Sequence, residues 1–332
     1  MIICKAPLRI SIGGGGTDLA SYYSYFESTF ISAAIDKYIY ISVHPIFIKD
    51  IILKYSDLER VLDVNDVKHP IIREAMKLAG VHDSIEISSF ADIPSGTGLG
   101  SSSTFTVALL KALYTHKNIL HDNLKLASDA CKIEIDLLKS PIGKQDQYIS
   151  AVGGLTRFDI NKEGQVKATP LKISQDIKTD LEEHLLLFFT GYSRNANDVL
   201  KEQDDQSKKA QVATGQSNSM IENLHYVKDL GIRIGKSLEA GDLNGFANLM
   251  NEHWEHKKKR SNKMSSGIID EWYALAKKNG ALGGKLIGAG GGGFLMFLAD
   301  DKRRLRKAMR DAGLRDVPFR FDELGAQVVL RG

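Results

Sequence analysis

The sequence is poor in cysteine, in net charge and in long apolar runs. Only Cys4 and Cys131 occur in 332 residues, too few for a disulfide framework or a metal-ligand cluster. The 44 basic and 41 acidic residues leave a net charge of +3, which does not favour nucleic acid as a partner. No signal segment opens the chain and no apolar run reaches membrane-spanning length. We therefore expect a cytoplasmic enzyme or binding protein without a membrane partner.

The length of the chain predicts two domains. A chain of 332 residues exceeds a comfortable single core. The tail from 268 to 330 is predicted to form a helix, two strands, a helix and a last strand at 325–330. That order is typical of an α+β domain with antiparallel strands. We therefore divide the chain into two domains, 1–175 and 176–332.

Residue patterns predict the main elements that precede this tail. The first third is rich in β-branched residues with partial period-2 alternation, which predicts strands. Helical patterns follow at 102–116 and at 122–139, where Asp122 is a predicted N-cap. Long polar helices are predicted up to about residue 260, with a break at EAGD (239–242). The basic cluster 301–310 has helical spacing and is interpreted as a solvated helix face.

Three segments are rich in glycine: 13–16, 94–104 and 288–293. None has the GxxxxGK[ST] spacing of a P-loop. The last segment matches GxGxxG from Gly288 to Gly293, but an apolar strand rather than a helix is predicted to follow it. This context argues against a dinucleotide site, and so against a dehydrogenase.

The segment PSGTGLGSSST (94–104) predicts an anion site. Gly96, Gly98 and Gly100 allow the backbone to curl after Pro94 ends a strand. The serines that follow begin an apolar helix, whose first N–H groups and positive dipole end attract negative charge. The alternative is an ordinary glycine-rich turn with a serine cap, although a cap needs fewer glycines and hydroxyls than this segment has.

Two carboxylates are predicted on helix faces that otherwise bear apolar residues. The neighbours of Glu134 three and four residues away are small or apolar, and Asp146 shares its face with Ile142 and Ile149. Burial of a carboxylate is costly unless it is paired, hydrogen-bonded or bound to a metal. Beside a phosphate site, one carboxylate would hold Mg²⁺ and the other would accept a proton from an attacking hydroxyl. A structural salt bridge is the alternative.

Three motifs resemble, in order, the signature motifs of the GHMP kinases, the superfamily of galactokinase, homoserine kinase, mevalonate kinase and phosphomevalonate kinase. The motifs are APLRISIGGGGTDL (6–19), PSGTGLGSSST (94–104) and KLIGAGGGGF (285–294). The resemblance implies a two-domain α+β fold, with an N-terminal domain like a ribosomal protein and a ferredoxin-like C-terminal domain.

Further features resemble one branch of this superfamily, the D-glycero-D-manno-heptose 7-phosphate kinases. These are the GGGGTD form of the first motif, GKQDQYISAVGG (143–154) and TGYSRNAND (190–198). Galactokinases have Glu-His where this chain has Gly15 and Gly16. The branch implies ATP and Mg²⁺ as cofactors and a small sugar phosphate as partner, and it allows a homodimer. The implied product is a heptose 1,7-bisphosphate that leads to nucleotide-activated heptose for bacterial lipopolysaccharide or capsule.

Motif matching extends the resemblance to individual residues. Asp146 corresponds to the catalytic base, Arg9 to the residue beside it, and Ser102 and Glu134 to the Mg²⁺ ligands. The ATP-binding positions are Pro94, Gly96, Gly98, Leu99, Gly100, Ser101, Ser102, Ser103 and Thr104. The sugar-binding positions are Gly14, Gly15, Gly16, Thr17, Asp18, Gly290 and Gly291.

The 7-phosphate requires a cationic site of its own. Arg194 in GYSRNAND is the first candidate, because arginine binds phosphate through two parallel hydrogen bonds. Lys258, Lys259 and Arg260 are weaker candidates, since a charge run on a helix is usually solvated.

Two other functions fit the same motifs. One is a different sugar 1-kinase of the superfamily, such as a fucose or N-acetylhexosamine kinase, which would accept an unphosphorylated sugar. The other is a nucleotide-binding regulator that has lost catalysis. A regulator would lack the base or a metal ligand, whereas Ser102, Glu134 and Asp146 are all present.

Overall fold

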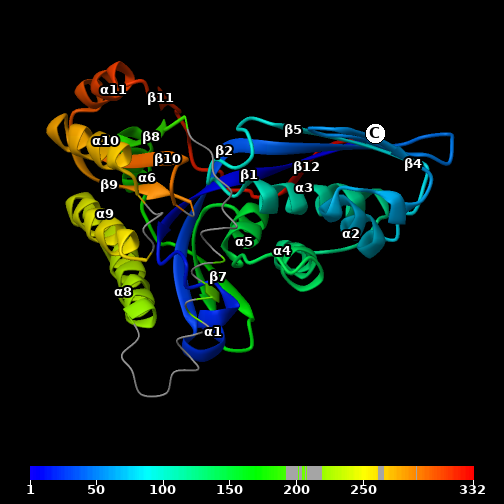
Figure 1. Cartoon of the computed structure of the whole chain (residues 1–332), viewed down its shortest axis with the longest axis horizontal. Helices are drawn as coiled ribbons and strands as arrows, with labels where there is room; N and C mark the ends of the chain where they lie inside the picture. The colour runs from blue at the N-terminus through cyan, green and yellow to red at the C-terminus, as the bar shows by residue number, and fades with distance from the viewer. Residues whose placement is uncertain (192–200, 202–203, 206, 208–218, 261–264, 289) are drawn as a thin grey trace.

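The computed structural model describes residues 1–191, 201, 204, 205, 207, 219–260, 265–288 and 290–332. Within these residues the strands form two sheets, each with helices packed on it (Figure 1). The mixed α+β class predicted from the sequence is therefore confirmed. No helix in these ranges combines the length and apolar character that a membrane span requires.

The first sheet is built around two long antiparallel strands, β1 (Ile2–Gly13) and β2 (Ser28–Pro45). Its path runs through β12 (Gln327–Arg331), β1, β2, β5 (Ile85–Ala91), β3 (Ile51–Lys54) and β4 (Leu58–Val61). The hairpin of β6 (Leu155–Ile160) and β7 (Val166–Pro170) joins β2 through β6. Only the β3 and β5 pair is parallel among these described pairings.

Helix α3 (Ser101–His116) packs on β1 and β2 and forms the centre of the first core. Around it lie α2 (Pro70–Ala79), α4 (Asn123–Cys131) and α5 (Gln145–Val152), while the short α1 (Ala20–Phe26) follows β1. Successive side chains of a strand point to opposite faces. Leu8 and Ile10 of β1 are therefore buried in the core, whereas Arg9 and Ser11 line a cavity.

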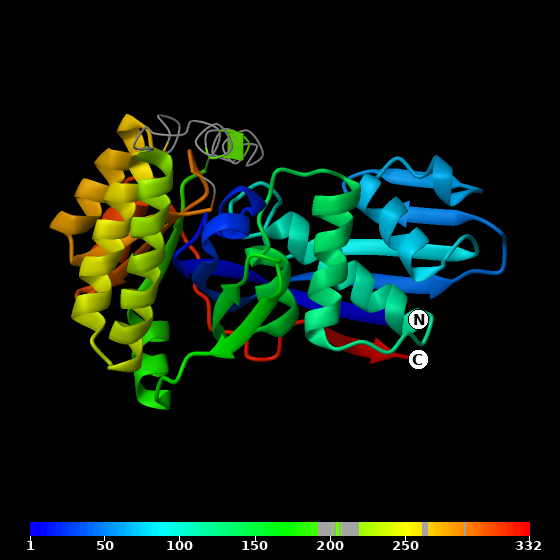
Figure 2. The same ribbon diagram turned by 90° about the horizontal axis from the view of Figure 1, so that it is seen from below.

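The second sheet has the antiparallel order β11 (Arg315–Asp316), β8 (Leu185–Phe189), β10 (Phe294–Ala299) and β9 (Ala281–Ile287). It carries α6 (Gln175–His184), α10 (Gly267–Lys278) and α11 (Lys302–Asp311). The antiparallel pair of α8 (Ser219–Glu239) and α9 (Leu243–Lys258) links the two sheets (Figure 2). Helix α9 packs on β9, and α8 packs on β1 and β2.

Several predicted elements are confirmed within one or two residues. Helix α3 occupies the predicted range, and the Asp122 carboxylate accepts a hydrogen bond of 2.7 Å from the backbone N–H of Lys125 as the N-cap of α4. Asp242, the last residue of the predicted break, caps α9. The helix predicted at 122–139 is regular only to Cys131, because Lys132–Leu137 form a π-helical segment.

The last predicted strand forms, but it joins a different sheet from the one we expected. We expected 325–330 to complete the sheet of the tail, but β12 pairs with β1 in the first sheet. The two-residue strand β11 takes the expected position beside β8. The outer edge of β1 has unpaired backbone groups that β12 satisfies, which brings the two chain ends together in Figure 2.

Candidate functional site

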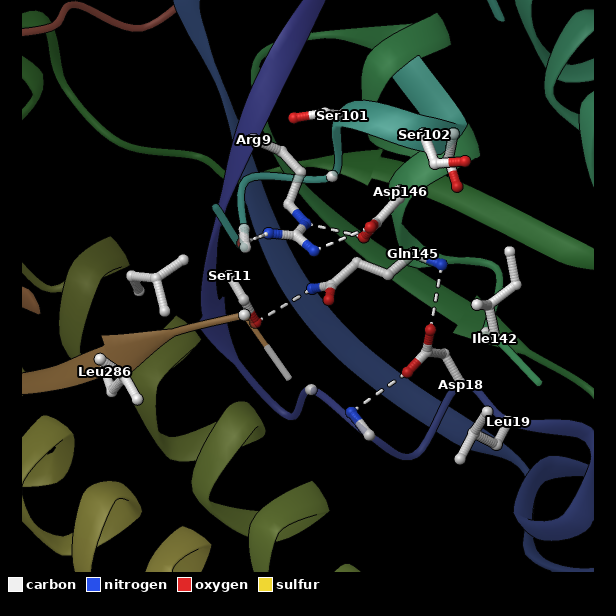
Figure 3. A pocket seen from close by; sticks show the side chains of 18 of the residues that line it. Arg9, Ser11, Asp18, Leu19, Ser101, Ser102, Ile142, Gln145, Asp146 and Leu286 are labelled. Atoms are coloured by element: carbon white, nitrogen blue, oxygen red, sulfur yellow. Dashed lines mark hydrogen bonds and ion pairs between the residues drawn. The ribbon is translucent and has the colours of Figure 1, made fainter. Parts of the chain in front are cut away.

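The glycine-rich loops meet at a cavity of about 320 Å³ between the two sheets. Its lining comes from β1, the loop after β1, the loop and first turn of α3, the start of α5, the end of α9 and the end of β9. Figure 3 shows that the side chains of Arg9 and Asp146 point toward each other, and that the Asp18 carboxylate points toward the backbone of Gln145. Segments more than 200 residues apart therefore form one site.

Arg9 and Asp146 form a bidentate ion pair on the wall of this cavity (Figure 3). Nε donates to Oδ1 at 2.7 Å and one terminal nitrogen donates to Oδ2 at 2.8 Å. The other terminal nitrogen donates to the carbonyl of Gly98 at 2.6 Å. Arg9 is 6% exposed. Because the guanidinium is anchored by three hydrogen bonds, it fixes the carboxylate in one orientation.

The loop before α3 has the geometry of an anion site. Gly96, Gly98 and Gly100 have φ values of +77°, +88° and +83°, which residues with a side chain rarely adopt. A Cβ on Gly100 would lie 3.0 Å from Oδ2 of Asp146. The chain can therefore run close to the ion pair and open the N-terminus of α3 toward the cavity, which Ser101, Ser102 and Ser103 line.

Glu134 lies in the π-helical segment and is 2% exposed, as the sequence predicted for the core-facing side. Its Oε2 accepts 2.8 Å from the amide of Gln147, and its Oε1 accepts 3.2 Å from the hydroxyl of Ser102. Burial raises the pKa of this carboxyl to about 7. Among the described residues Glu134 has no ion-pair partner, so the structural salt bridge considered above is not formed there.

Asp18 is held by backbone donors. Its Oδ1 accepts from the N–H of Gly16 and its Oδ2 from that of Gln145, both at 3.1 Å. Burial raises the pKa of this carboxyl, and the nearby charge of Asp146 adds to the increase. A Cβ on Gly143 would lie 1.9 Å from Oδ2, so the carboxylate fills the space that a side chain at 143 would need.

The four glycines after β1 have two different surroundings. A Cβ on Gly13 would lie 3.0 Å from the Cα of Gly231 in α8, and one on Gly14 would lie 2.5 Å from the carbonyl of Thr29. Gly15 and Gly16 line the cavity instead. The first two glycines therefore allow close packing, and the last two bring backbone to the site.

Several residues predicted for the site support it from outside the cavity lining. The loop residues Leu99 and Thr104 are fully buried, and the Thr17 hydroxyl bonds to the carbonyl of Gly14 at 2.8 Å. The structure does not place Pro94, Leu99, Thr104, Gly14, Thr17, Gly290 or Gly291 among the lining residues. Arg194 lies outside the described residues.

The third glycine-rich segment (288–293) packs on the second (94–104), since a Cβ on Gly288 would lie 2.6 Å from the Cα of Gly98.

Four basic side chains on the remaining wall, which we call the cationic cluster, are His253, Lys257, Arg260 and Lys285. All are between 1% and 8% exposed. Of these, sequence reasoning considered only Arg260. The spacing of His253, Lys257 and Arg260 by four and three residues puts them on one helical face, a signal that could have found them. The neighbouring Lys259 is exposed, and Lys258 pairs with Glu255 and Asp270.

These features can perform a defined chemistry together. Helix N–H groups can hold an anion, and an ionised carboxylate beside them can take a proton from a hydroxyl. One further buried carboxylate beside a hydroxyl is suited to a hard divalent cation. The cavity therefore brings together parts needed to add an anionic group to an alcohol.

Known proteins share this architecture. The family model described as the GHMP kinases N terminal domain matches residues 66–154, and that described as GHMP kinases C terminal matches residues 236–313. The chain is 30% identical to the D-glycero-alpha-D-manno-heptose 7-phosphate kinase of Campylobacter jejuni, over 92% of each chain.

Solved structures agree with these matches. A D-glycero-D-manno-heptose 1-phosphate kinase from Bacteroides thetaiotaomicron has a TM-score of 0.81 and 26% identity over 100% of both chains. Lactococcus lactis galactokinase complexed with galactose has a TM-score of 0.76 over 99% of this chain and 94% of that one. At 18% identity the second likeness concerns the fold alone.

Proposed function

Because this chain belongs to the GHMP kinase family, whose members transfer phosphoryl groups to alcohols, we propose that it phosphorylates the anomeric hydroxyl of D-glycero-D-manno-heptose 7-phosphate. The phosphoryl donor is ATP and the product is the 1,7-bisphosphate. The Campylobacter jejuni relative, whose name carries this substrate, supports the choice of sugar. In a cell, the product would feed synthesis of nucleotide-activated heptose in the cytoplasm.

The observation that carries the proposal is the bidentate pair of Arg9 and Asp146 beside the N-terminus of α3. The anomeric oxygen attacks the γ-phosphorus of ATP, ADP leaves, and Asp146 takes the hydroxyl proton. Arg9 holds the Asp146 carboxylate in place through two hydrogen bonds and stabilises negative charge on the transferred group. The amides at the start of α3 hold the phosphates in line.

Ser102 and Glu134 would hold Mg²⁺. The residues fit this ion, because a buried carboxylate with no cationic partner among the described residues lies beside a hydroxyl that faces the cavity. Described residues provide no group of three or more His, Cys, Asp or Glu side chains that could hold a metal. Mg²⁺ commonly binds one or two carboxylates and takes its other ligands from water and substrate phosphates. When bound, it neutralises charge on the phosphates.

The sugar would lie against Asp18 and the backbone of Gly15 and Gly16. Asp18 is fixed by two backbone donors, and its remaining lone pairs can accept from sugar hydroxyls. Two glycines in place of larger side chains leave room for a bulky sugar.

We also propose that the chain has the two domains 1–175 and 176–332. Strand β12, from the end of the second range, completes the sheet of the first.

An ATP-coupled assay across 7-phosphorylated, 6-phosphorylated and unphosphorylated sugars tests the function, with mass analysis of the product. We expect turnover of the heptose 7-phosphate and a product heavier by one phosphoryl group at the anomeric position. Preferred turnover of an unphosphorylated sugar such as fucose would contradict the proposal and favour the other sugar 1-kinases. Absence of turnover with every sugar would favour a regulator.

A further inference from the structure

The cationic cluster collects positive charge at the cavity, where the charge of the Asp18 carboxylate acts on Arg260 without forming an ion pair with it among the described residues. Lys285 donates to the carbonyl of Ile12 at 2.7 Å, Lys257 donates to that of Leu286 at 3.0 Å, and Arg260 donates to that of Gly15 at 3.0 Å. None of the three cations forms an ion pair with a carboxylate among the described residues. Carbonyl oxygens satisfy hydrogen bonds but leave the charges uncompensated.

Some polar atoms in the cluster also have no hydrogen-bond partner within the part of the chain that the structure describes. They are one terminal nitrogen of Arg260, which is a donor, and both ring nitrogens of His253, of which one is a donor and the other an acceptor in the neutral ring. These side chains are 5% and 3% exposed, and both line the cavity. Buried polar atoms without a partner are rare in folded proteins. Such donors indicate an acceptor that arrives from the cavity.

Burial of several cations close together disfavours their charged forms, and this lowers their pKa values. Burial, with the neighbouring charges of Arg260 and Arg9, lowers the pKa of Lys285 to about 7. Burial also lowers the pKa of Arg260 to about 10 and that of Lys257 well below its usual value. A dianion placed among these groups would restore their charged forms and remove the repulsion between them.

We propose that the cationic cluster binds the phosphate group which the sugar substrate already carries, and so makes the enzyme specific for sugar phosphates. This inference rests on the proposed function. A phosphate monoester offers two charges and three acceptor oxygens, and arginine binds it through two parallel hydrogen bonds. The cluster reaches the loop 13–16, which lies beside Asp18, whereas the first turn of α3 lies beside Asp146. Arg260 and Lys285 thus lie on a different wall from the first turn of α3, while Lys257 also donates to the carbonyl of Gly288, in the loop that packs on Gly98.

Kinetics of two variants test this assignment. Lys285→Met nearly keeps the length of the side chain, Arg260→Gln leaves a shorter polar side chain, and both remove the charge. Lys259→Ala removes an exposed lysine beside the cluster as the control. In the first two we expect the KM for heptose 7-phosphate to rise about 10- to 100-fold, as for lost hydrogen bonds to a charged group. The KM for ATP and the kcat/KM for unphosphorylated heptose should stay within about twofold, because neither reaction step uses a hydrogen bond from the cluster to a sugar phosphate.

Two kinetic outcomes overturn the inference. The first is an equal loss for the phosphorylated and unphosphorylated sugar, which would leave the cluster a structural role in holding the glycine loops. The second is a rise in the KM for ATP alone, which would assign the cluster to the nucleotide. Lys259→Ala should match the unaltered enzyme in every measurement.

Binding of inorganic phosphate gives a readout without catalysis. Isothermal titration calorimetry of the unaltered protein at pH 8, without nucleotide, should show a phosphate site whose occupation takes up protons, because the anion bound there recharges Lys285. Arg260→Gln should abolish this site while circular dichroism shows a folded protein. No phosphate site in the unaltered protein, or an unchanged one in Arg260→Gln, overturns the inference. If the unaltered protein binds phosphate here but phosphorylates no sugar, only the proposed function fails.

Discussion

The carboxylate of Asp146 is the group whose removal should most directly stop the reaction. In Asp146→Asn the amide cannot accept the hydroxyl proton, although it keeps the size of the side chain. We expect kcat to fall about 10²- to 10⁴-fold, while the KM values for ATP and sugar change little. Steady-state kinetics measure both. Asp136→Asn, on the exposed side of the preceding helix, is the control and should remain active. Near-normal turnover by Asp146→Asn would disprove the assignment of the base.

The assignment of Glu134 as a Mg²⁺ ligand predicts how its removal changes the Mg²⁺ requirement. Glu134→Gln preserves the shape of the side chain but removes the charge that would attract the cation. The half-saturating Mg²⁺ concentration should rise about tenfold or more, as for other losses around a metal site. A titration of activity against Mg²⁺ at saturating ATP measures it. An unaltered Mg²⁺ dependence would make Glu134 a structural carboxylate that bonds to Gln147 and Ser102.

Position 143 requires glycine because a neighbouring side chain occupies the space of a Cβ, and not because of its backbone conformation. The space beside it is filled by the carboxylate of Asp18, only 1.9 Å from an added Cβ. Gly143→Ala should displace Asp18, lower the free energy of unfolding by about 1–3 kcal/mol, and raise the KM for the sugar. Gly267→Ala is the matched control, since nothing lies within 4 Å of an added Cβ there. Equal behaviour of the two variants in urea unfolding would contradict this account.

At the scale of elements, the close packing of α8 against the loop 13–16 requires glycine on both sides of the contact. Helix propensity alone predicts that Gly231→Ala stabilises α8 by about 1 kcal/mol. A Cβ at 231 would however lie 2.9 Å from the backbone of Gly14, which cannot move without disturbing the loop. We expect the contact to dominate and the Tm to fall by about 2–4 °C for each kcal/mol lost.

Gly235 provides the control on the same helix. A Cβ there would lie 2.9 Å from the end of the Ile31 side chain, which can rotate away, and 3.8 Å from the end of Leu171, an ordinary contact. Gly235→Ala should therefore be neutral or stabilising, as propensity predicts. Differential scanning calorimetry of the two variants tests the comparison. If Gly231→Ala raises the Tm as much as Gly235→Ala, the contact between α8 and the loop is unimportant for stability.

For the whole molecule, the cationic cluster predicts how stability depends on pH. Lys285 titrates near pH 7 in the folded state but near 10.5 in the unfolded state. Between these values the unfolded chain holds more protons than the folded one, so stability rises with pH. Lysines with an ordinary pKa give no such slope in this range. We expect the free energy of unfolding to increase by about 1 kcal/mol per pH unit from pH 7 to 9.

Urea unfolding in a buffer free of phosphate measures this slope. The groups around Lys285 are His253, Lys257, Arg260 and Arg9, and burial also lowers the pKa of His253 and of Lys257. Lys285→Met should reduce the slope, leaving the part due to Lys257. Addition of inorganic phosphate should flatten it in the unaltered protein, since the anion keeps Lys285 charged. An identical slope in Lys285→Met would show that this lysine titrates normally.

The sequence by itself determined the features that depend on near neighbours. Helix α3, the cap at Asp122 and the burial of Glu134 follow from residues within one or two turns. The positive φ angles of Gly96, Gly98 and Gly100 likewise follow from the local pattern of glycines before a helix. These features were predictable because helix periodicity, capping and turn conformation are short-range effects.

Only the tertiary structure decided which distant segments meet. The pattern of β12 identifies a strand but not its partner, since any free edge offers the same backbone groups. A run of basic residues after His253 resembles a solvated face until β9 and the loop 13–16 bury one side of it. Burial depends on the packing of elements far apart in sequence, and burial is what makes the cationic cluster a binding site rather than a charged surface.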